Sequence, residues 1–325
     1  MEKREVRRSM RRPVAALVVL AALAGGLALA ARGPARHPSG AGPAAASAAS
    51  AASAAAPRPV DLADRIDAYT AAVTVGGYTA PDPAQRRAVA DGVRSAVDGR
   101  PDRAGRLLAA VGYRLTEFTE AVSGRRTAEI ADASGTDPRG WGRIYLDLST
   151  PAGWSAQVPH PVSDSRTEAL GAELFRAAPG GVLVLAGAHR RAGTDGSADV
   201  AHRDDTVFAA VVEALAARGL PGVQLHGFAE DSLPGTDAVV SSGAGTAGGI
   251  AERTADGLAA AGLAVCRAWR ETCGRLEGTT NVQGRFAAGL GVPWVHVELA
   301  NPLRTDPARR ARVVAALAGA VSGGP

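Results

Sequence analysis

The second half of the chain repeats one pattern, in which a short apolar run is followed by a longer segment with helical periodicity. The apolar runs, which predict strands, occupy 155–158, 182–186, 223–225, 238–241, 264–267 and 292–299. The segments that predict helices occupy 167–177, 206–218, 250–261, 282–290 and 306–321. Strands that alternate with helices favour an α/β fold, here a mostly parallel (mixed) sheet flanked by helices. We therefore assign residues 151–325 to one α/β domain.

Residues 59–150 carry a different order of elements. Helical periodicity at 61–74, 82–98 and 102–111 precedes three segments that predict strands, at 113–121, 127–133 and 142–148. Pro83 after Asp82, and Pro101 before Asp102, are signals for the start of a helix. We expect this region to be an N-terminal helical extension, with strands of its own, that packs on the main domain.

The first 58 residues have the composition of a targeting segment and a linker. Residues 1–12 are basic, and residues 13–31 form an almost uninterrupted apolar run. This order predicts a signal peptide, cleaved after Ala30, or alternatively an uncleaved N-terminal anchor in the membrane. Residues 32–58 are rich in Ala, Ser, Pro and Gly and predict a linker. In either case we expect the remainder to be exported, secreted or associated with the cell envelope.

The charge of the chain argues against a nucleic-acid partner. The formal net charge is +4, from 36 basic and 32 acidic residues. Residues 1–58 contain nine of the basic and two of the acidic residues, which leaves 27 basic and 30 acidic residues in the predicted fold. The fold is therefore slightly acidic, whereas nucleic-acid-binding domains are usually basic.

The two cysteines predict a disulfide. Cys266 and Cys273 are the only cysteines and have six residues between them. In an exported chain they would meet an oxidising compartment, which favours a local bridge after the strand at 264–267. Two cysteines at this spacing do not make a zinc site of the CxxC type.

Histidines follow several of the predicted strands. His160, His189 and His226 each come at or just after a strand end, and the last strand contains His296 and Glu298. Because ligands bind at the carboxyl ends of parallel strands, these side chains are expected to converge on one crevice.

The loop after the first of these strands adds a carboxylate. His160 and Asp164 lie four residues apart, and His226 would add a second imidazole. Three such ligands leave a coordination position open for water, as catalytic zinc requires. One zinc ion there would lower the pKa of water and polarise a carbonyl group. Glu168 is the competing carboxylate ligand, although its place in the first turn of a helix also has a structural explanation.

Glu298 is the candidate general base. It shares one face of its strand with Trp294 and His296. A glutamate in an apolar strand needs a partner or a function, because burying it unpaired is costly. Arg304 is the structural alternative to a catalytic role.

The order of these residues resembles that of the zinc carboxypeptidase-like superfamily, which includes N-formylglutamate amidohydrolases and poly-γ-glutamate hydrolases. The resemblance covers about residues 150–310 and lies in His160, Asp164, His226-Gly227 and Glu298. It implies that His160, Asp164 and His226 bind zinc and that Glu298 activates water. Carboxypeptidases use His-x-x-Glu, whereas the spacing here is longer and the carboxylate belongs to an aspartate.

The same resemblance implies that an arginine binds a substrate carboxylate, and Arg190 is the candidate. His189 and Asn281 are further candidates for contact with the substrate. Alternatively, His189 and His202 form a second metal site or hold one another through Asp199, and Thr280 caps a helix. The segment 243–248 has the G-x-G-x-x-G spacing of a nucleotide-binding loop, but no acidic residue ends a strand about 20 residues further on.

These residues lead to one main hypothesis. The chain is expected to be an exported zinc-dependent amidohydrolase or carboxypeptidase-like hydrolase that cleaves an amide in a small peptide or acylated amino acid. The alternative is a catalytically inactive envelope protein that binds a carboxylated ligand or a wall fragment. We expect no nucleic-acid partner, and membrane contact only through an uncleaved N-terminal segment.

Removal of residues 1–58 should leave a protein that folds and keeps its activity, because the deleted segment cannot form a core. Circular dichroism and thermal unfolding should agree with those of a protein that begins at residue 32. Aggregation of the shorter protein alone would contradict the boundary.

Overall fold

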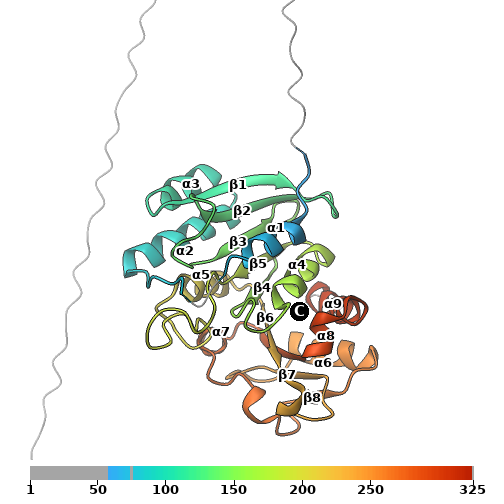
Figure 1. Cartoon of the computed structure of the whole chain (residues 1–325). Helices are drawn as coiled ribbons and strands as arrows, with labels where there is room; N and C mark the ends of the chain where they lie inside the picture. Colours follow the sequence, from blue (N-terminus) through green and yellow to red (C-terminus); the bar gives the residue numbers. More distant parts are fainter. Residues whose placement is uncertain (1–57, 74–75, 324–325) are drawn as a thin grey trace, which may run out of the picture. The chain divides into compact units, whose positions relative to one another are not determined.

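Nine strands form one mixed sheet in the part of the chain that the structure describes (Figure 1). The computed structural model describes residues 58–73 and 76–323, so the predicted signal segment and almost all of the linker lie outside it. Across the sheet the strand order is β1-β2-β3-β5-β4-β6-β9-β7-β8. The strands are β1 (Tyr113–Thr119), β2 (Arg126–Asp132), β3 (Arg143–Asp147), β4 (Trp154–Val158), β5 (Gly181–Leu185), β6 (Gly222–Phe228), β7 (Ala238–Ser241), β8 (Val265–Arg267) and β9 (Trp294–Ala300).

The predicted α/β fold with a mixed sheet is confirmed. The centre of the sheet is parallel, because β5, β4, β6 and β9 all run in one direction. The strands β1, β2 and β3 from the N-terminal region pair antiparallel and extend one edge of the same sheet. At the other side β7 runs antiparallel to β9, and β8 is parallel to β7.

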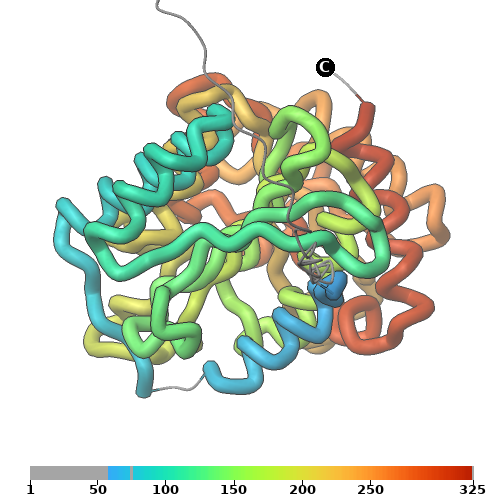
Figure 2. Tube along the Cα trace, turned by 90° about the horizontal axis from the view of Figure 1, so that it is seen from above, coloured from blue at the N-terminus to red at the C-terminus, as the bar shows by residue number. Residues whose placement is uncertain are grey.

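Helices cover both faces of the sheet. One face carries α1 (Leu62–Thr70), α4 (Thr167–Ala177), α6 (Ile250–Ala260), α8 (Asn301–Thr305) and α9 (Pro307–Ser322), whose apolar side chains share one core with the strands. The opposite face carries α2 (Pro83–Val97), α3 (Pro101–Ala109) and α5 (Val207–Ala216), which pack around a second core. The helix α7 (Val282–Leu290) packs beside α5. Figure 2 shows α2 and α9 on opposite sides of the molecule.

The local sequence explains where the longer helices begin. Asp82 accepts hydrogen bonds from the backbone N–H groups of Ala84 and Gln85, and the Gln85 side chain accepts one from Asp82 N, which completes a capping box. Asp61 and Asp306 cap α1 and α9 in a similar way. The helix predicted over 61–74 ends earlier, at Thr70. The short α8 and the 3-10 turns η1 (Glu230–Ser232) and η2 (Gly274–Leu276) were not predicted, because such short elements have no readable periodicity.

None of the helices in the described ranges is both long enough and apolar enough to cross a membrane.

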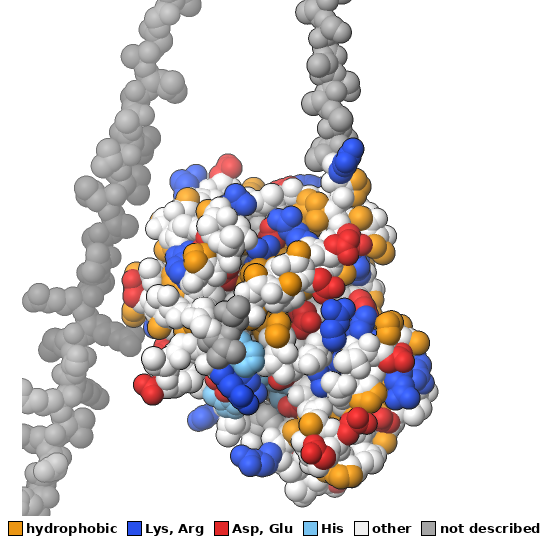
Figure 3. Space-filling view, viewed as in Figure 1, with side chains coloured by type: hydrophobic (Ala, Val, Ile, Leu, Met, Phe, Trp, Pro, Cys, Tyr) orange, Lys and Arg blue, Asp and Glu red, His pale blue; other side chains and the backbone are white. Residues whose placement is uncertain are grey.

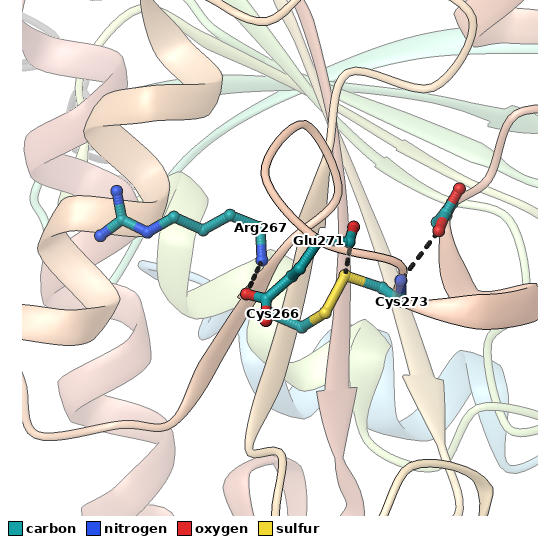
Figure 4. The surroundings of a disulfide bond; sticks show 5 residues. Cys266, Arg267, Glu271 and Cys273 are labelled. Carbon is teal, nitrogen blue, oxygen red and sulfur yellow. Dashed lines mark hydrogen bonds between the residues drawn. A yellow bond between two sulfur atoms is a disulfide. The ribbon is translucent and has the colours of Figure 1, made fainter.

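Cys266 and Cys273 form the predicted disulfide, which closes the loop after β8 (Figure 4). Two hydrogen bonds support this loop: Arg267 N donates to the Glu271 carboxylate at 3.0 Å, and Cys273 N donates to the Glu277 carboxylate at 2.8 Å. The chain then passes through η2 to Asn281 at the start of α7. The bridge therefore anchors the beginning of the segment 274–281.

Replacement of both cysteines by alanine should loosen the segment 268–281 more than the rest of the fold. The closed loop is short, so we expect a loss of about 2 kcal/mol in the free energy of unfolding. Amide hydrogen exchange should rise in this segment while β4 and β6 in the same protein keep their protection. An equal rise in all strands would contradict this local role.

Candidate metal centre

Three neighbouring parallel strands, β4, β6 and β9, bring the predicted ligands together. His160 follows β4 by two residues, and His226 on β6 is the register partner of Glu298 on β9. Because the three strands run in the same direction, their carboxyl ends meet at one edge of the sheet. All three side chains line one cavity of about 880 Å³. In the view of Figure 3, histidine side chains lie at the surface of the molecule beside basic and acidic ones.

His160, Asp164 and His226 form a buried group of metal-ligand type. Asp164 Oδ2 lies 3.3 Å from His160 Nδ1 and 3.2 Å from His226 Nδ1. One such atom from each residue lies within 4.8 Å of the other two, and no second group of this kind occurs among the described residues. Tetrahedral zinc with bonds of about 2.0–2.1 Å places its ligand atoms about 3.3 Å apart. The two short separations therefore have the size that zinc needs.

The loop that carries the first two ligands follows a fixed path. Asp164 N donates to the His160 carbonyl oxygen at 3.0 Å. Val162 has a φ of 67°, a left-handed conformation that is costly for a β-branched residue. The Glu168 carboxylate accepts a hydrogen bond of 3.3 Å from Val162 N. Glu168, the competing ligand in the sequence, thus supports the loop, and Asp164 is the carboxylate beside the histidines.

Asp164 is ionised although it is buried. Burial raises the pKa of its carboxyl group, but hydrogen bonds from His160 and His226 hold this pKa well below its usual value when the ring nitrogens that face it carry protons. A cation in place of those protons has the same effect. Gly227 N also donates to Asp164 Oδ2, at 3.3 Å. The cluster therefore contains a full negative charge.

A second carboxylate fixes the tautomer of His160. His160 Nε2 lies 2.7 Å from Asp199 Oδ1. Because a carboxylate only accepts, Nε2 carries a proton. Nδ1 lies 3.3 Å from Asp164 Oδ2 and 3.4 Å from Arg190 Nη1, and it is the nitrogen that can bind a cation when it carries no proton. Burial lowers the pKa of His160, but its hydrogen bonds to Asp164 and Asp199 outweigh burial, so the net shift is upward. The pKa of Asp199 is held low in spite of burial, first by His160 and then by His202.

His226 contributes a neutral imidazole. Its Nε2 lies 3.0 Å from Gln224 Oε1, and burial lowers its pKa to about 4. If Nε2 donates to Gln224, the bare Nδ1 faces the ionised Asp164 Oδ2 across 3.2 Å. Two lone pairs at this distance repel unless a cation lies between them. The ligand atoms that this cluster offers therefore fit a divalent cation such as zinc, which takes His nitrogen and Asp oxygen.

Glu298 lies at the same cavity with one oxygen unpaired. Its Oε1 is 3.4 Å from His296 Nε2, whereas Oε2 is buried and has no hydrogen-bond partner among the described residues. Arg304, the structural alternative, instead donates to the backbone oxygens of Leu299, Ser165 and Phe228. Arg304 therefore lies near enough to Glu298 for their charges to interact but forms no hydrogen bond with it, and Oε2 keeps its capacity to accept a proton.

The predicted substrate ligands have different surroundings. Asn281 lines the cavity and donates to Gln224 Oε1 at 2.6 Å. Arg190 also lines it, but its guanidinium group forms an ion pair of 2.8 Å with Asp199. His189 is absent from the cavity lining and accepts a hydrogen bond from Arg191 N. Its position thus gives no support to contact with a substrate, and Asp199 bridges His202 to His160 rather than to His189.

Sequence reasoning missed several residues of the cavity. Arg191 and Arg275 line it and are exposed, and the described residues give neither of them an ion-pair partner. Gln224 was missed although it lies two residues before His226, on the same face of β6. That spacing was the available signal, because polar side chains within a buried strand usually form hydrogen bonds with neighbouring polar groups.

The glycine-rich segment 243–248 belongs to another part of the molecule. Gly245 and Gly248 line a separate cavity of about 220 Å³ beside Trp294, and this cavity shares no lining residue with the one at the histidines.

No protein-family model matches the chain, and no curated protein matches it. Among solved structures, it is similar to N-formylglutamate amidohydrolase from Ralstonia eutropha JMP134, with 13% identity, coverage of 55% of this chain and 95% of that one, and a TM-score of 0.41. A bacteriophage poly-γ-glutamate hydrolase has 17% identity, coverage of 55% and 87%, and a TM-score of 0.39. An aspartoacylase family protein from Mesorhizobium loti MAFF303099 has 12% identity, coverage of 66% and 69%, and a TM-score of 0.34.

Two of these structures carry the names of families that the order of histidines and carboxylates resembles. At identities of 12–17%, the similarity to these structures concerns the fold alone. We therefore base the chemistry of the site on the cluster itself.

Asp199→Asn should weaken zinc binding about 10-fold, because the amide can still accept a hydrogen bond from His160 but no longer supplies a negative charge. Competition with a chelator of known affinity measures the change. Asp205→Asn, which alters an exposed partner of Arg203, is the matched control and should bind zinc like the unchanged protein. Equal affinities for all three proteins would show that Asp199 does not support the ligand.

Proposed function

We propose that the chain is a zinc-dependent hydrolase that cleaves an amide bond in a small peptide or acylated amino acid. The observation that supports this proposal is the position of Glu298 beside the cluster of His160, Asp164 and His226, in one cavity and with Oε2 unpaired. A metal cluster alone would also suit a structural ion. A carboxylate with an unused oxygen at the same cavity is what hydrolysis by activated water requires.

The residues have separate tasks in this proposal. His160, Asp164 and His226 would hold the zinc ion, which supplies a Lewis acid for the carbonyl oxygen and makes water more acidic. Glu298 Oε2 accepts a proton from the attacking water and passes it to the leaving nitrogen. His296 Nε2 lies 3.4 Å from the other carboxylate oxygen, Oε1, and Oε2 has no partner among the described residues.

The cavity favours a substrate with a carboxylate group. Arg190 is already paired with Asp199, so we assign carboxylate binding to Arg191 and Arg275, whose guanidinium groups have no acidic partner among the described residues. Either side chain offers paired donors that match a carboxylate. The substrates named by two similar structures, N-formylglutamate and poly-γ-glutamate, have this character.

We further propose that the protein is exported, which rests on the sequence of residues 1–58. The disulfide between Cys266 and Cys273 supports this location, because such bridges persist in oxidising compartments. A peptide or acyl amino acid of the cell envelope would then be within reach, with no nucleic acid involved.

Glu298→Gln should lower turnover by about 10²–10⁴-fold and leave the zinc content nearly unchanged, because the amide keeps the shape but cannot accept the proton. His160→Ala and His226→Ala should lose the metal. Zinc is measured by elemental analysis, and activity on a panel of N-acyl amino acids and γ-glutamyl peptides. Glu117→Gln, at an exposed ion pair with Arg126, is the matched control.

Two outcomes would contradict this assignment. If Glu298→Gln removes the zinc, Glu298 is a ligand and not the base. If the unchanged protein contains zinc, binds a carboxylated peptide and hydrolyses none of the panel, it is the inactive envelope binder.

A further inference from the structure

We infer that a buried relay of amide side chains fixes the tautomers of His226 and His296, so that His226 presents a bare nitrogen to the metal and His296 carries its proton on the nitrogen nearer to Glu298. The relay consists of Gln157, Gln224, Gln283 and Asn281. The role that we assign to these tautomers rests on the proposed function, whereas the tautomers themselves do not depend on it.

The relay has two ends whose hydrogen-bonding roles cannot change. Trp294 Nε1 only donates, and it lies 3.1 Å from Gln157 Oε1. The Val200 carbonyl oxygen only accepts, and it lies 2.7 Å from Gln283 Nε2. These contacts determine which end of each amide is the oxygen and which is the nitrogen. Gln157 and Gln283 must therefore both turn a carbonyl oxygen toward Gln224.

These two oxygens determine the orientation of the Gln224 amide group. Its Nε2 donates to Gln157 Oε1 at 3.3 Å and to Gln283 Oε1 at 3.1 Å. Its Oε1 must then point the other way, where His226 Nε2 lies at 3.0 Å. Asn281 Nδ2 lies 3.3 Å from the same Nε2, but it donates to the same Gln224 oxygen at 2.6 Å. Because an amide oxygen only accepts, we place the proton of a neutral His226 on Nε2, which leaves Nδ1 bare. The bare Nδ1 is the atom that lies 3.2 Å from Asp164 Oδ2.

The same oxygen also orients the second histidine. Asn281 Nδ2 donates to Gln224 Oε1 at 2.6 Å, which fixes the amide of Asn281. The same nitrogen lies 3.3 Å from His226 Nε2 and 3.4 Å from His296 Nδ1. One of its two hydrogens is used for Gln224 Oε1, and with a proton already on His226 Nε2 the other is left for His296 Nδ1, which then carries no proton. The proton of a neutral His296 is therefore on Nε2, which lies 3.4 Å from Glu298 Oε1 without forming a hydrogen bond among the described residues.

The relay is well protected from water. Gln157, Gln224, Gln283 and Asn281 are 0–3% exposed, and so is His296. Alternation along β4, β6 and β9 puts the relay residues of the strands on one face, and the first turn of α7 supplies Asn281 and Gln283. Turning one amide over would leave several buried groups unpaired, at about 1–3 kcal/mol for each of them. The orientation is therefore enforced by the whole set.

The tautomers can be measured without metal or substrate. In the metal-free chain, labelled with ¹⁵N-histidine and kept in mildly alkaline buffer, two-bond ¹H–¹⁵N correlation spectra distinguish the protonated ring nitrogen from the bare one. We expect both His226 and His296 to carry the proton on Nε2. A proton on Nδ1 of His226 would overturn the inference, whatever the activity of the protein.

A substitution tests whether Gln224 enforces this state. Gln224→Met keeps the volume but removes the acceptor, so His226 should populate both tautomers and zinc affinity should fall about 10–100-fold. Thr254→Val is the matched control, because it removes a fully buried hydroxyl that has no partner in the part of the chain that the structure describes and lies outside the relay. Wild-type tautomers and affinity in Gln224→Met would overturn the inference, and if this variant does not fold, the spectrum of the unchanged chain decides alone.

The two proposals can fail separately. If the protein shows the expected tautomers but binds no zinc, the inference about the relay holds and the proposed function is wrong. A chain that binds zinc and hydrolyses amides while His226 carries its proton on Nδ1 retains the proposed function and refutes the relay.

Discussion

The ionised carboxylate of Asp164, buried between two imidazole rings, is the interaction on which the rest of the site depends. A buried charge is costly unless it is paired, and the groups that face it are the Gly227 N–H and the Nδ1 atoms of His160 and His226. Asp199 Oδ1 lies 2.7 Å from His160 Nε2 and Gln224 Oε1 lies 3.0 Å from His226 Nε2, so a proton on each Nε2 leaves the two Nδ1 atoms for a cation. The polar network thus offers a cation one carboxylate oxygen and two ring nitrogens, with the Arg190 guanidinium group 3.4 Å from His160 Nδ1.

The topology of the sheet explains why these groups can meet. β4, β6 and β9 are neighbours and parallel, although long stretches of chain separate them. Each crossover passes through helices that cover the sheet, so the strand ends are held by both cores while the loops beyond them remain free to carry polar side chains. The antiparallel β7 does not end at this edge. The glycine-rich segment that follows it therefore lies beside Trp294 and not beside the histidines.

The sequence predicted the elements and the core of the site because both depend on local patterns. Apolar runs and helical periodicity located almost every strand and long helix, and polar residues after the strands pointed to His160, Asp164, His226 and Glu298. Contacts between distant elements carry no such signal. The pairing of Arg190 with Asp199, the exposure of Arg191 and Arg275 at the cavity, and the alignment of Gln157 with Gln224 and Gln283 follow from loop paths and from the register of neighbouring strands. A local pattern cannot specify these features.

The treatment of other buried carboxylates shows what is unusual about Glu298. Glu129 accepts hydrogen bonds from Arg65, Arg143 and Tyr145, so that both of its oxygens are paired. Glu120 likewise accepts hydrogen bonds with both oxygens, from backbone N–H groups and from Arg176. Within the described residues, Glu298 Oε2 is the one buried carboxylate oxygen with no partner, and Arg304, a cation close in sequence, is directed to backbone oxygens instead. The fold pairs Glu129 and Glu120 and leaves Glu298 Oε2 unpaired at a metal-type cluster, which is the arrangement that the proposed role of Glu298 as general base requires.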